Sequence, residues 1–183
     1  MSANTVWNVD PAHTNVEFAV RHLMISTVKG RFGEVKGTVE LDLANPAAAR
    51  VDVTIGVESI DTRNADRDAH LRSADFFDTA SYPEMRYVSR RVKALPDGTY
   101  QVEGDLTIRG VTRNVPLTAT LEGTGADPWG GQRAGFSATG KLNRGEFGLH
   151  WNKALETGGV VVGDEVKLVV EAELVLAAAK AAA

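Results

Sequence analysis

Alternation of apolar and polar residues along nearly the whole chain is the feature that most constrains its fold. Within residues 15–21, Val16, Phe18 and Val20 alternate with polar or small neighbours, and residues 51–57 follow the same rule. A period of two residues is typical of a β-strand with one buried face. The pattern predicts eight strands, at residues 15–21, 38–43, 51–57, 86–93, 100–108, 115–121, 134–142 and 166–176. The chain is therefore expected to be all-β.

Turn chemistry separates these segments and indicates antiparallel pairing. Pro96-Asp97-Gly98, residues 127–131 and Gly163-Asp164 carry the fixed or positive φ that hairpin reversals need. Several strands run near ten residues, about 34 Å, which is long for a strand. Closing eight such strands into a barrel removes exposed edges and leaves an interior just wide enough for side chains or one slender ligand. We expect a single barrel domain over residues 1–183, with 177–183 as a tail.

Small residues interrupt the face of these strands that is expected to point inward. Two interpretations are open: a narrow apolar tunnel, or small residues that only let the strands coil and bend. The residues concerned alternate with larger apolar ones, as in Ala134, Phe136, Ala138, Gly140 and Leu142, with Gly104 and Ala119 in the neighbouring strands.

A charged segment, residues 59–78, breaks the strand pattern and predicts a short helical insertion around residues 62–77. Asn64 is a suitable N-cap, and acids in the first turn with bases in the last suit the helix dipole. At helical spacing Asp66 faces His70, and Asp68 faces Arg72. The first pair is open to two interpretations, an orienting acid with a general base or an ordinary surface pair.

Two aromatic residues follow the predicted helix. Phe76 and Phe77 are expected to anchor the helix on the barrel, one toward the interior and one against the helix.

Composition excludes several classes of function. The 183 residues carry a net charge of −4 without a basic stripe, so nucleic acid is not an expected partner. The chain has no cysteine, and its four histidines lack metal-ligand spacing, so no metal site and no cofactor is predicted. Nucleophile motifs are absent as well, so no catalytic residue is assigned.

No apolar stretch approaches the roughly 20 residues of a spanning helix, and no stable membrane insertion is expected. The start shows no secretory pattern, which predicts a cytoplasmic protein.

An ordered series of motifs resembles the YceI family from end to end. The series comprises Asp10-Pro11-Ala12-His13-Thr14, Val16-x-Phe18-x-Val20-x-His22, Gly30-x-Phe32, Asp61-Thr62, Arg67-Asp68-x-His70-Leu71-Arg72-Ser73-x-Asp75-Phe76-Phe77-Asp78, Tyr82-Pro83, the segment 104–112 and Arg144-x-x-Phe147-Gly148. The resemblance implies an extended, lipocalin-like eight-stranded barrel that binds a polyisoprenoid or another long amphiphilic lipid, often as a homodimer and without an established catalytic residue. Thr14 stands where the family has serine, which keeps the hydroxyl. Many relatives are exported, whereas the expected location here favours a cytoplasmic prenyl lipid or isoprenoid quinone.

These implications yield a predicted ligand-binding set. The apolar lining is expected from Phe18, Val20, Phe32, Phe76, Phe136, Phe147 and Trp151, with Ala138 and Gly140 leaving room for the tail. His22, Arg67 and His70 are expected near the polar head.

Three functions follow from the sequence. The leading one is non-enzymatic binding, sequestration or transport of a long-chain isoprenoid. An alternative is an enzyme acting on a prenyl lipid, with His70 and Asp66 or Asp68 as acid and base. A third is an assembly protein with a packed interior.

Overall fold

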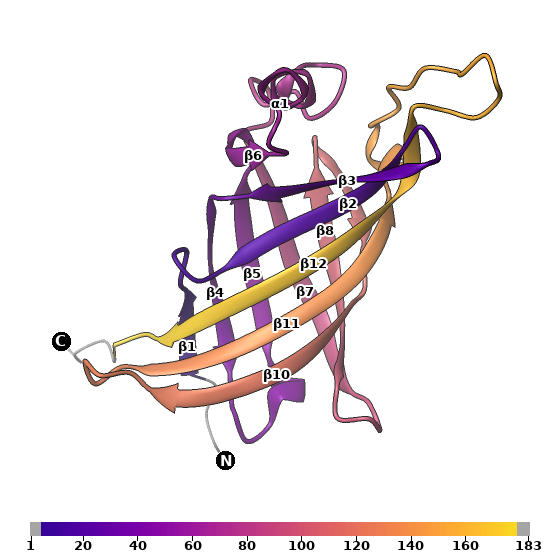
Figure 1. Cartoon of the computed structure of the whole chain (residues 1–183). Helices are drawn as coiled ribbons and strands as arrows, with labels where there is room; N and C mark the ends of the chain where they lie inside the picture. The colour runs from indigo at the N-terminus through magenta and orange to yellow at the C-terminus, as the bar shows by residue number, and fades with distance from the viewer. Residues whose placement is uncertain (1–4, 179–183) are drawn as a thin grey trace.

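The computed structural model describes residues 5–178, which form an antiparallel β-barrel with one α-helix at one end (Figure 1). The strands that enclose the barrel run in the order β1, β4, β5, β7, β8, β10, β11 and β12, and β12 pairs back onto β1. This confirms the predicted eight-stranded barrel. The elements are β1 (Thr5–Val9), β2 (Asn15–His22), β3 (Ser26–Phe32), β4 (Val35–Leu41), η1 (Pro46–Ala48), β5 (Arg50–Gly56), η2 (Val57–Ser59), β6 (Ile60–Asp61), α1 (Ala65–Arg72), β7 (Glu84–Ala94), β8 (Tyr100–Ile108), β9 (Val111–Asn114), β10 (Leu117–Ala126), β11 (Gln132–Asn143), η3 (Arg144–Phe147) and β12 (Val162–Leu176).

β12 holds the barrel together because it pairs with three strands. It runs antiparallel to β11 from Glu165 to Val175 and lies against β2 over its first part. Its last residues pair with β1, where Trp7 opposes Leu176 and Val9 opposes Leu174. The backbone N–H of Ala177 continues this contact by donating to Val6 at 2.9 Å. Residues 179–183 of the predicted tail lie outside the described residues.

The sequence prediction omitted four strands: β1, β3 and the short β6 and β9. β1 has five residues with only two buried, so its alternation is too short to recognise. In β3 the central inward position is Gly30, which has no side chain to mark the buried face. β2 and β3 continue the sheet from β12 toward β6 and α1.

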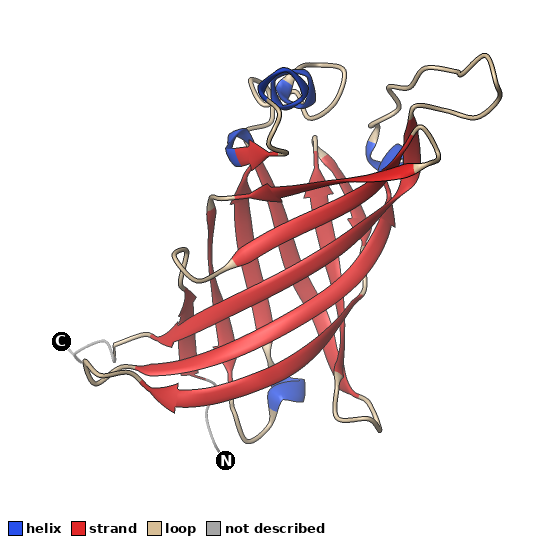
Figure 2. Ribbon diagram, in the orientation of Figure 1, coloured by secondary structure: helices blue, strands red, loops and turns tan. Residues whose placement is uncertain are grey.

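The helical segment and the 3₁₀ turn η1 lie at opposite ends of the barrel, as Figure 2 shows. The N-cap of α1 is Asn64, whose side chain accepts a hydrogen bond from the Arg67 backbone N–H at 3.0 Å, so the predicted N-cap is confirmed. α1 stands above the barrel end that carries β6 and η2 (Figure 1). None of the helices within residues 5–178 is long and apolar enough to span a membrane.

Both predicted side-chain pairs within α1 are wrong. His70 contacts Asp75 instead of Asp66, with Nε2 and Oδ2 2.9 Å apart, because the turn after Ser73 brings Asp75 back beside the helix. Asp68 is buried and accepts hydrogen bonds from the backbone and hydroxyl of Thr62, at 2.9 and 2.5 Å. Arg72 instead donates to backbone carbonyls of the segment that precedes the helix. These contacts attach the helix to the barrel and leave no Asp–His dyad along its face.

The most deeply buried side chains gather at two places. Trp7, Leu41 and Leu174 are 1–3% exposed where β1 closes the barrel. Beneath α1, Val57, Ile60 and Phe147 are 0–1% exposed. Each such side chain contributes roughly 1.5–3 kcal/mol by leaving water. The space between these two packed regions is the site described next.

Candidate functional site

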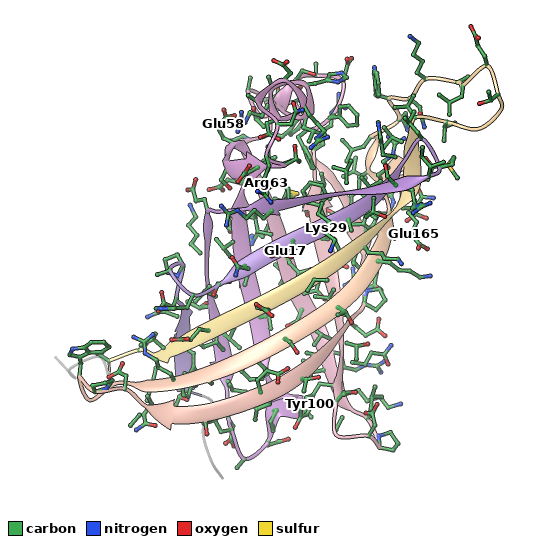
Figure 3. All side chains as sticks on the ribbon, in the orientation of Figure 1. Glu17, Lys29, Glu58, Arg63, Tyr100 and Glu165 are labelled. Carbon is green, nitrogen blue, oxygen red and sulfur yellow. The ribbon has the colours of Figure 1, made fainter. Side chains whose placement is uncertain are left out.

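The barrel encloses an apolar cavity of about 300 Å³. This volume lies at the lower end of the range of small-molecule sites, which is roughly 300–1,000 Å³. Glu17 and Arg144 are the charged residues among those that border it. Glu17 is exposed, and its side chain points to the outer face of β2 (Figure 3). The wall of the cavity is therefore almost entirely hydrocarbon.

The end of the cavity beneath α1 is closed by packed aromatic and aliphatic side chains. Phe32 is 5% exposed and lies 5.6 Å from Phe18 and 5.9 Å from Phe77 between ring centroids. Phe76, 6% exposed, also borders the cavity, with Leu71 and Leu149 beside it. Both phenylalanines of the pair thus face the cavity, and Phe76 in addition packs against His70 of the helix.

Arg144 also borders this closed end, but its guanidinium is hydrogen-bonded to backbone carbonyls. Its side chain is 5% exposed, and its guanidinium donates to the carbonyls of Leu149, Trp151 and Gly163 at 2.6, 2.9 and 2.8 Å. Burial lowers its pKa. With these carbonyls as acceptors, Arg144 joins η3, the following loop and the start of β12, and its role here is structural.

The small residues of the inward face divide into two kinds. Ala119 and Ala138 oppose each other across β10 and β11, and both border the cavity. The glycines do not widen it, because neighbours already cover them. A Cβ at Gly104 would lie 2.3 Å from the Tyr87 ring, and one at Gly140 would lie 2.6 Å from the Leu117 side chain. The alanines fit the tunnel interpretation, and the glycines accommodate large residues of adjacent strands.

The structure places six of the twelve predicted ligand-binding residues in the lining: Phe18, Val20, Phe32, Phe76, Phe136 and Ala138. The other six lie elsewhere. Gly140 is covered as described, and Phe147 is completely buried behind the lining. Trp151 packs on the outer side of Phe76, at 5.4 Å between ring centroids.

The three residues predicted near a polar head do not border the cavity. His22 ends β2 and opposes Ser26 in the hairpin. Arg67 donates to the hydroxyl and carbonyl of Thr62 at 2.7 and 2.8 Å, and so holds the helix in place. The side chain of His70 is 38% exposed, and its ring lies 4.7 Å from that of Trp151.

Sequence reasoning missed several lining residues, of which Tyr100 is the most informative. Tyr100 begins β8 and shares the inward face with Val102 and Leu106, so the period of two already placed it. Figure 3 shows it near the barrel end that carries η1. Leu71, Phe77 and Leu149 were missed because the helix α1 and the loops that carry them fold back over the barrel.

A second cluster of polar residues lies outside the cavity, where β1 meets β12. Oxygen and nitrogen atoms of Asp10, His13 and Glu173 lie within 4.8 Å of one another. Arg133 donates to both carboxylates, so a cation of the chain itself already pairs with them. Hydrogen bonds from His13 and Arg133 lower the pKa of Asp10 to about 2. These contacts connect the end of β1 to β11 and β12.

Comparisons with known proteins agree with this architecture. Residues 7–174 match the model of the YceI-like domain. The chain is 48% identical over 137 residues to Protein YceI of Escherichia coli O17:K52:H18, a match that covers 75% of this chain and 71% of that protein. The crystal structure of BcnA of Burkholderia cenocepacia aligns with a TM-score of 0.78 at 25% identity, over 90% of this chain and 98% of that one.

A more distant solved structure shares the fold. A polyisoprenoid binding domain from Saccharophagus degradans aligns with a TM-score of 0.67 at 14% identity, over 95% of this chain and 99% of that one. Because the domain match extends over most of the chain and the identity to Protein YceI is high, the chain belongs to the YceI family.

Proposed function

We propose that this protein binds a long-chain amphiphilic lipid of the isoprenoid class inside its barrel and releases it unchanged. The observation that carries the proposal is a cavity with an almost purely apolar lining, closed at one end by packed aromatic rings. Such a site favours a flexible hydrocarbon and offers little to a polar metabolite. The structural neighbour named as a polyisoprenoid binding domain supports the same ligand class.

The energetics of burial are sufficient for useful affinity. Each buried methylene-sized group gains about 0.8 kcal/mol, so one five-carbon isoprene unit contributes about 4 kcal/mol before the costs of association. Two buried units would contribute about 8 kcal/mol before those costs, so several buried units are needed for micromolar or tighter binding. Additional units would give tight, slowly exchanging binding.

The proposal is non-enzymatic because of where the polar groups lie. Within residues 5–178 the charged side chain that faces the cavity is Arg144, and backbone carbonyls occupy its guanidinium. His70, the base of the alternative hypothesis, contacts Asp75 at the surface and does not border the cavity.

Titration of delipidated protein with geranylgeraniol tests the proposal. We expect saturable binding with a negative heat-capacity change, and the lipid recovered afterwards should be chemically unchanged. Lack of saturation would overturn lipid binding, whereas recovery of a converted product would favour the enzymatic alternative.

A further inference from the structure

Burial along β5, β7 and β8 shows where this side of the barrel covers the cavity least. In β5, Val51 and Val53 are half-buried, whereas Ile55, nearer α1, is 7% exposed. In β7, Val92 is half-buried and Met85 is 5% exposed. In all three strands, β8 included, inward-facing side chains become more buried from the η1 end toward the α1 end. Leu41 of β4 is 1% exposed although it also lies at the η1 end, so the part of that end that is least covered is the side formed by β5, β7 and β8.

The covering at the η1 end is thin. η1 is a single 3₁₀ turn without a buried residue. β8 pairs with β10 only at three positions, the last of which joins Tyr100 to Ala119. Beyond Ala119, β10 keeps β11 as its partner, and among the described residues no strand pairs with its other edge. The barrel wall thus opens beside Tyr100.

Tyr100 brings a free polar group to this opening. Within residues 5–178 its hydroxyl has no hydrogen-bond partner, and its side chain borders the cavity. Tyr87, which faces the same cavity, differs in this respect. Its hydroxyl donates toward the carbonyls of Val102 and Val115, at 3.3 and 3.0 Å. Tyr100 thus carries an uncommitted donor and acceptor on a side chain that borders the apolar lining.

The charge of the lining constrains the head group. Among the described residues that line the cavity, no lysine or arginine lies near η1, and Arg50 and Lys93 at this end are exposed outside the lining. Arg144 lies at the closed end, with backbone carbonyls on its guanidinium. An anionic phosphate drawn inside the lining would lose hydration without gaining a cationic partner there. A neutral hydroxyl or carbonyl head needs one good hydrogen bond.

We propose that the lipid enters tail-first through the η1 end, that its tail terminus rests on the aromatic floor beneath α1, and that its neutral polar head binds the Tyr100 hydroxyl. The inference rests on the proposed function and adds to it the direction of binding, the head-group class and a specificity residue. The sequence analysis expected the polar head near His22, Arg67 and His70. The present inference places it at the opposite end of the barrel.

Matched ligands test the role of Tyr100. The Tyr100→Phe variant and the unaltered protein are titrated with geranylgeraniol, with the hydrocarbon that carries the same tail without the hydroxyl, and with geranylgeranyl diphosphate. We expect the variant to bind the alcohol about fivefold more weakly, the loss of one neutral hydrogen bond, and the hydrocarbon with unchanged affinity. Equal weakening of both ligands would show a packing role and overturn the assignment. Tighter binding of the diphosphate than of the alcohol would overturn the neutral-head assignment.

Single-cysteine labelling tests the direction of binding independently. The chain has no natural cysteine. Asn45→Cys precedes η1 and makes no side-chain cap, whereas Ala69→Cys is exposed on α1, so each position takes a fluorophore without losing a contact. A geranylgeraniol ether with a nitroxide on its head should quench the label at position 45 more strongly. Stronger quenching at position 69 would overturn the orientation while leaving lipid binding intact. Failure of every probe to bind would overturn the proposed function and this inference with it.

Discussion

Replacing Ala138 with phenylalanine should close the cavity at its middle. Ala138 opposes Ala119 and Val170 in the neighbouring strands, and its methyl group faces the cavity. The added ring occupies the space of about one isoprene unit, roughly five methylene-sized groups at about 0.8 kcal/mol each. The expected loss is therefore about 4 kcal/mol, or about a thousandfold in Kd for geranylgeraniol.

Thr139→Phe is the matched control, because the adjacent residue is exposed on the outer wall of the same strand. Isothermal titration with geranylgeraniol and a thermal melt of each variant form the assay. Ala138→Phe should melt no lower than the unaltered protein, since its ring is buried, and Thr139→Phe should bind normally. Unchanged affinity of a folded Ala138→Phe protein would refute the placement of the lipid. Gly140→Phe cannot serve the same purpose, because a Cβ there already meets Leu117.

Three further predictions concern stability. Gly30→Ala should lower the free energy of unfolding by about 1–3 kcal/mol in a denaturant titration, since its Cβ would lie 2.3 Å from the Phe18 ring. Gly33→Ala is the control, because a Cβ there would have nothing within 4 Å, and it should change the free energy of unfolding by less than about 0.5 kcal/mol. Equal effects of the two substitutions would contradict the packing argument. Arg144→Lys should cost about 3 kcal/mol or more, because a lysine cannot reach the separate carbonyls that the guanidinium joins, and a native melting curve would contradict its structural role. The pKa of Asp10 is lowered from 3.8 to about 2, so its contribution to stability is present above pH 4 and is lost as the pH falls toward 2. Asp10→Asn should therefore flatten that part of the stability–pH profile. An unchanged slope would contradict a stabilising role of the Asp10–His13–Arg133–Glu173 cluster.

The barrel could be predicted because its physical cause is local. The long strands alternate inward and outward side chains over most of their lengths, most clearly in β8, although bulges interrupt β7 between Ser89 and Arg91 and β10 between Leu121 and Gly123. β1 escaped prediction because five residues carry too little of that pattern. β3 escaped because the ring of Phe18, on the neighbouring strand, fills the inward position above Gly30, and sequence cannot show such a contact between strands.

The site was predicted only in part, because the sequence shows which way a strand residue points but not which residues a polar side chain contacts. Apolar residues on the inward face of strands, such as Phe18 and Phe136, reach the cavity because the strand direction decides their orientation. The partners of polar residues depend on how loops return. His70 meets Asp75, five positions along the chain, only because the turn after α1 folds back. The helical spacing that suggested Asp66 carries no information about that turn.

Native mass spectrometry of the purified protein, together with solvent extraction and identification of whatever it releases, tests the central claim most directly. The account predicts one isoprenoid lipid per chain with a neutral head group, and its replacement by added geranylgeraniol after delipidation. A protein of apo mass that takes up no isoprenoid would contradict lipid binding and would favour the interpretation of the barrel as a packed assembly module.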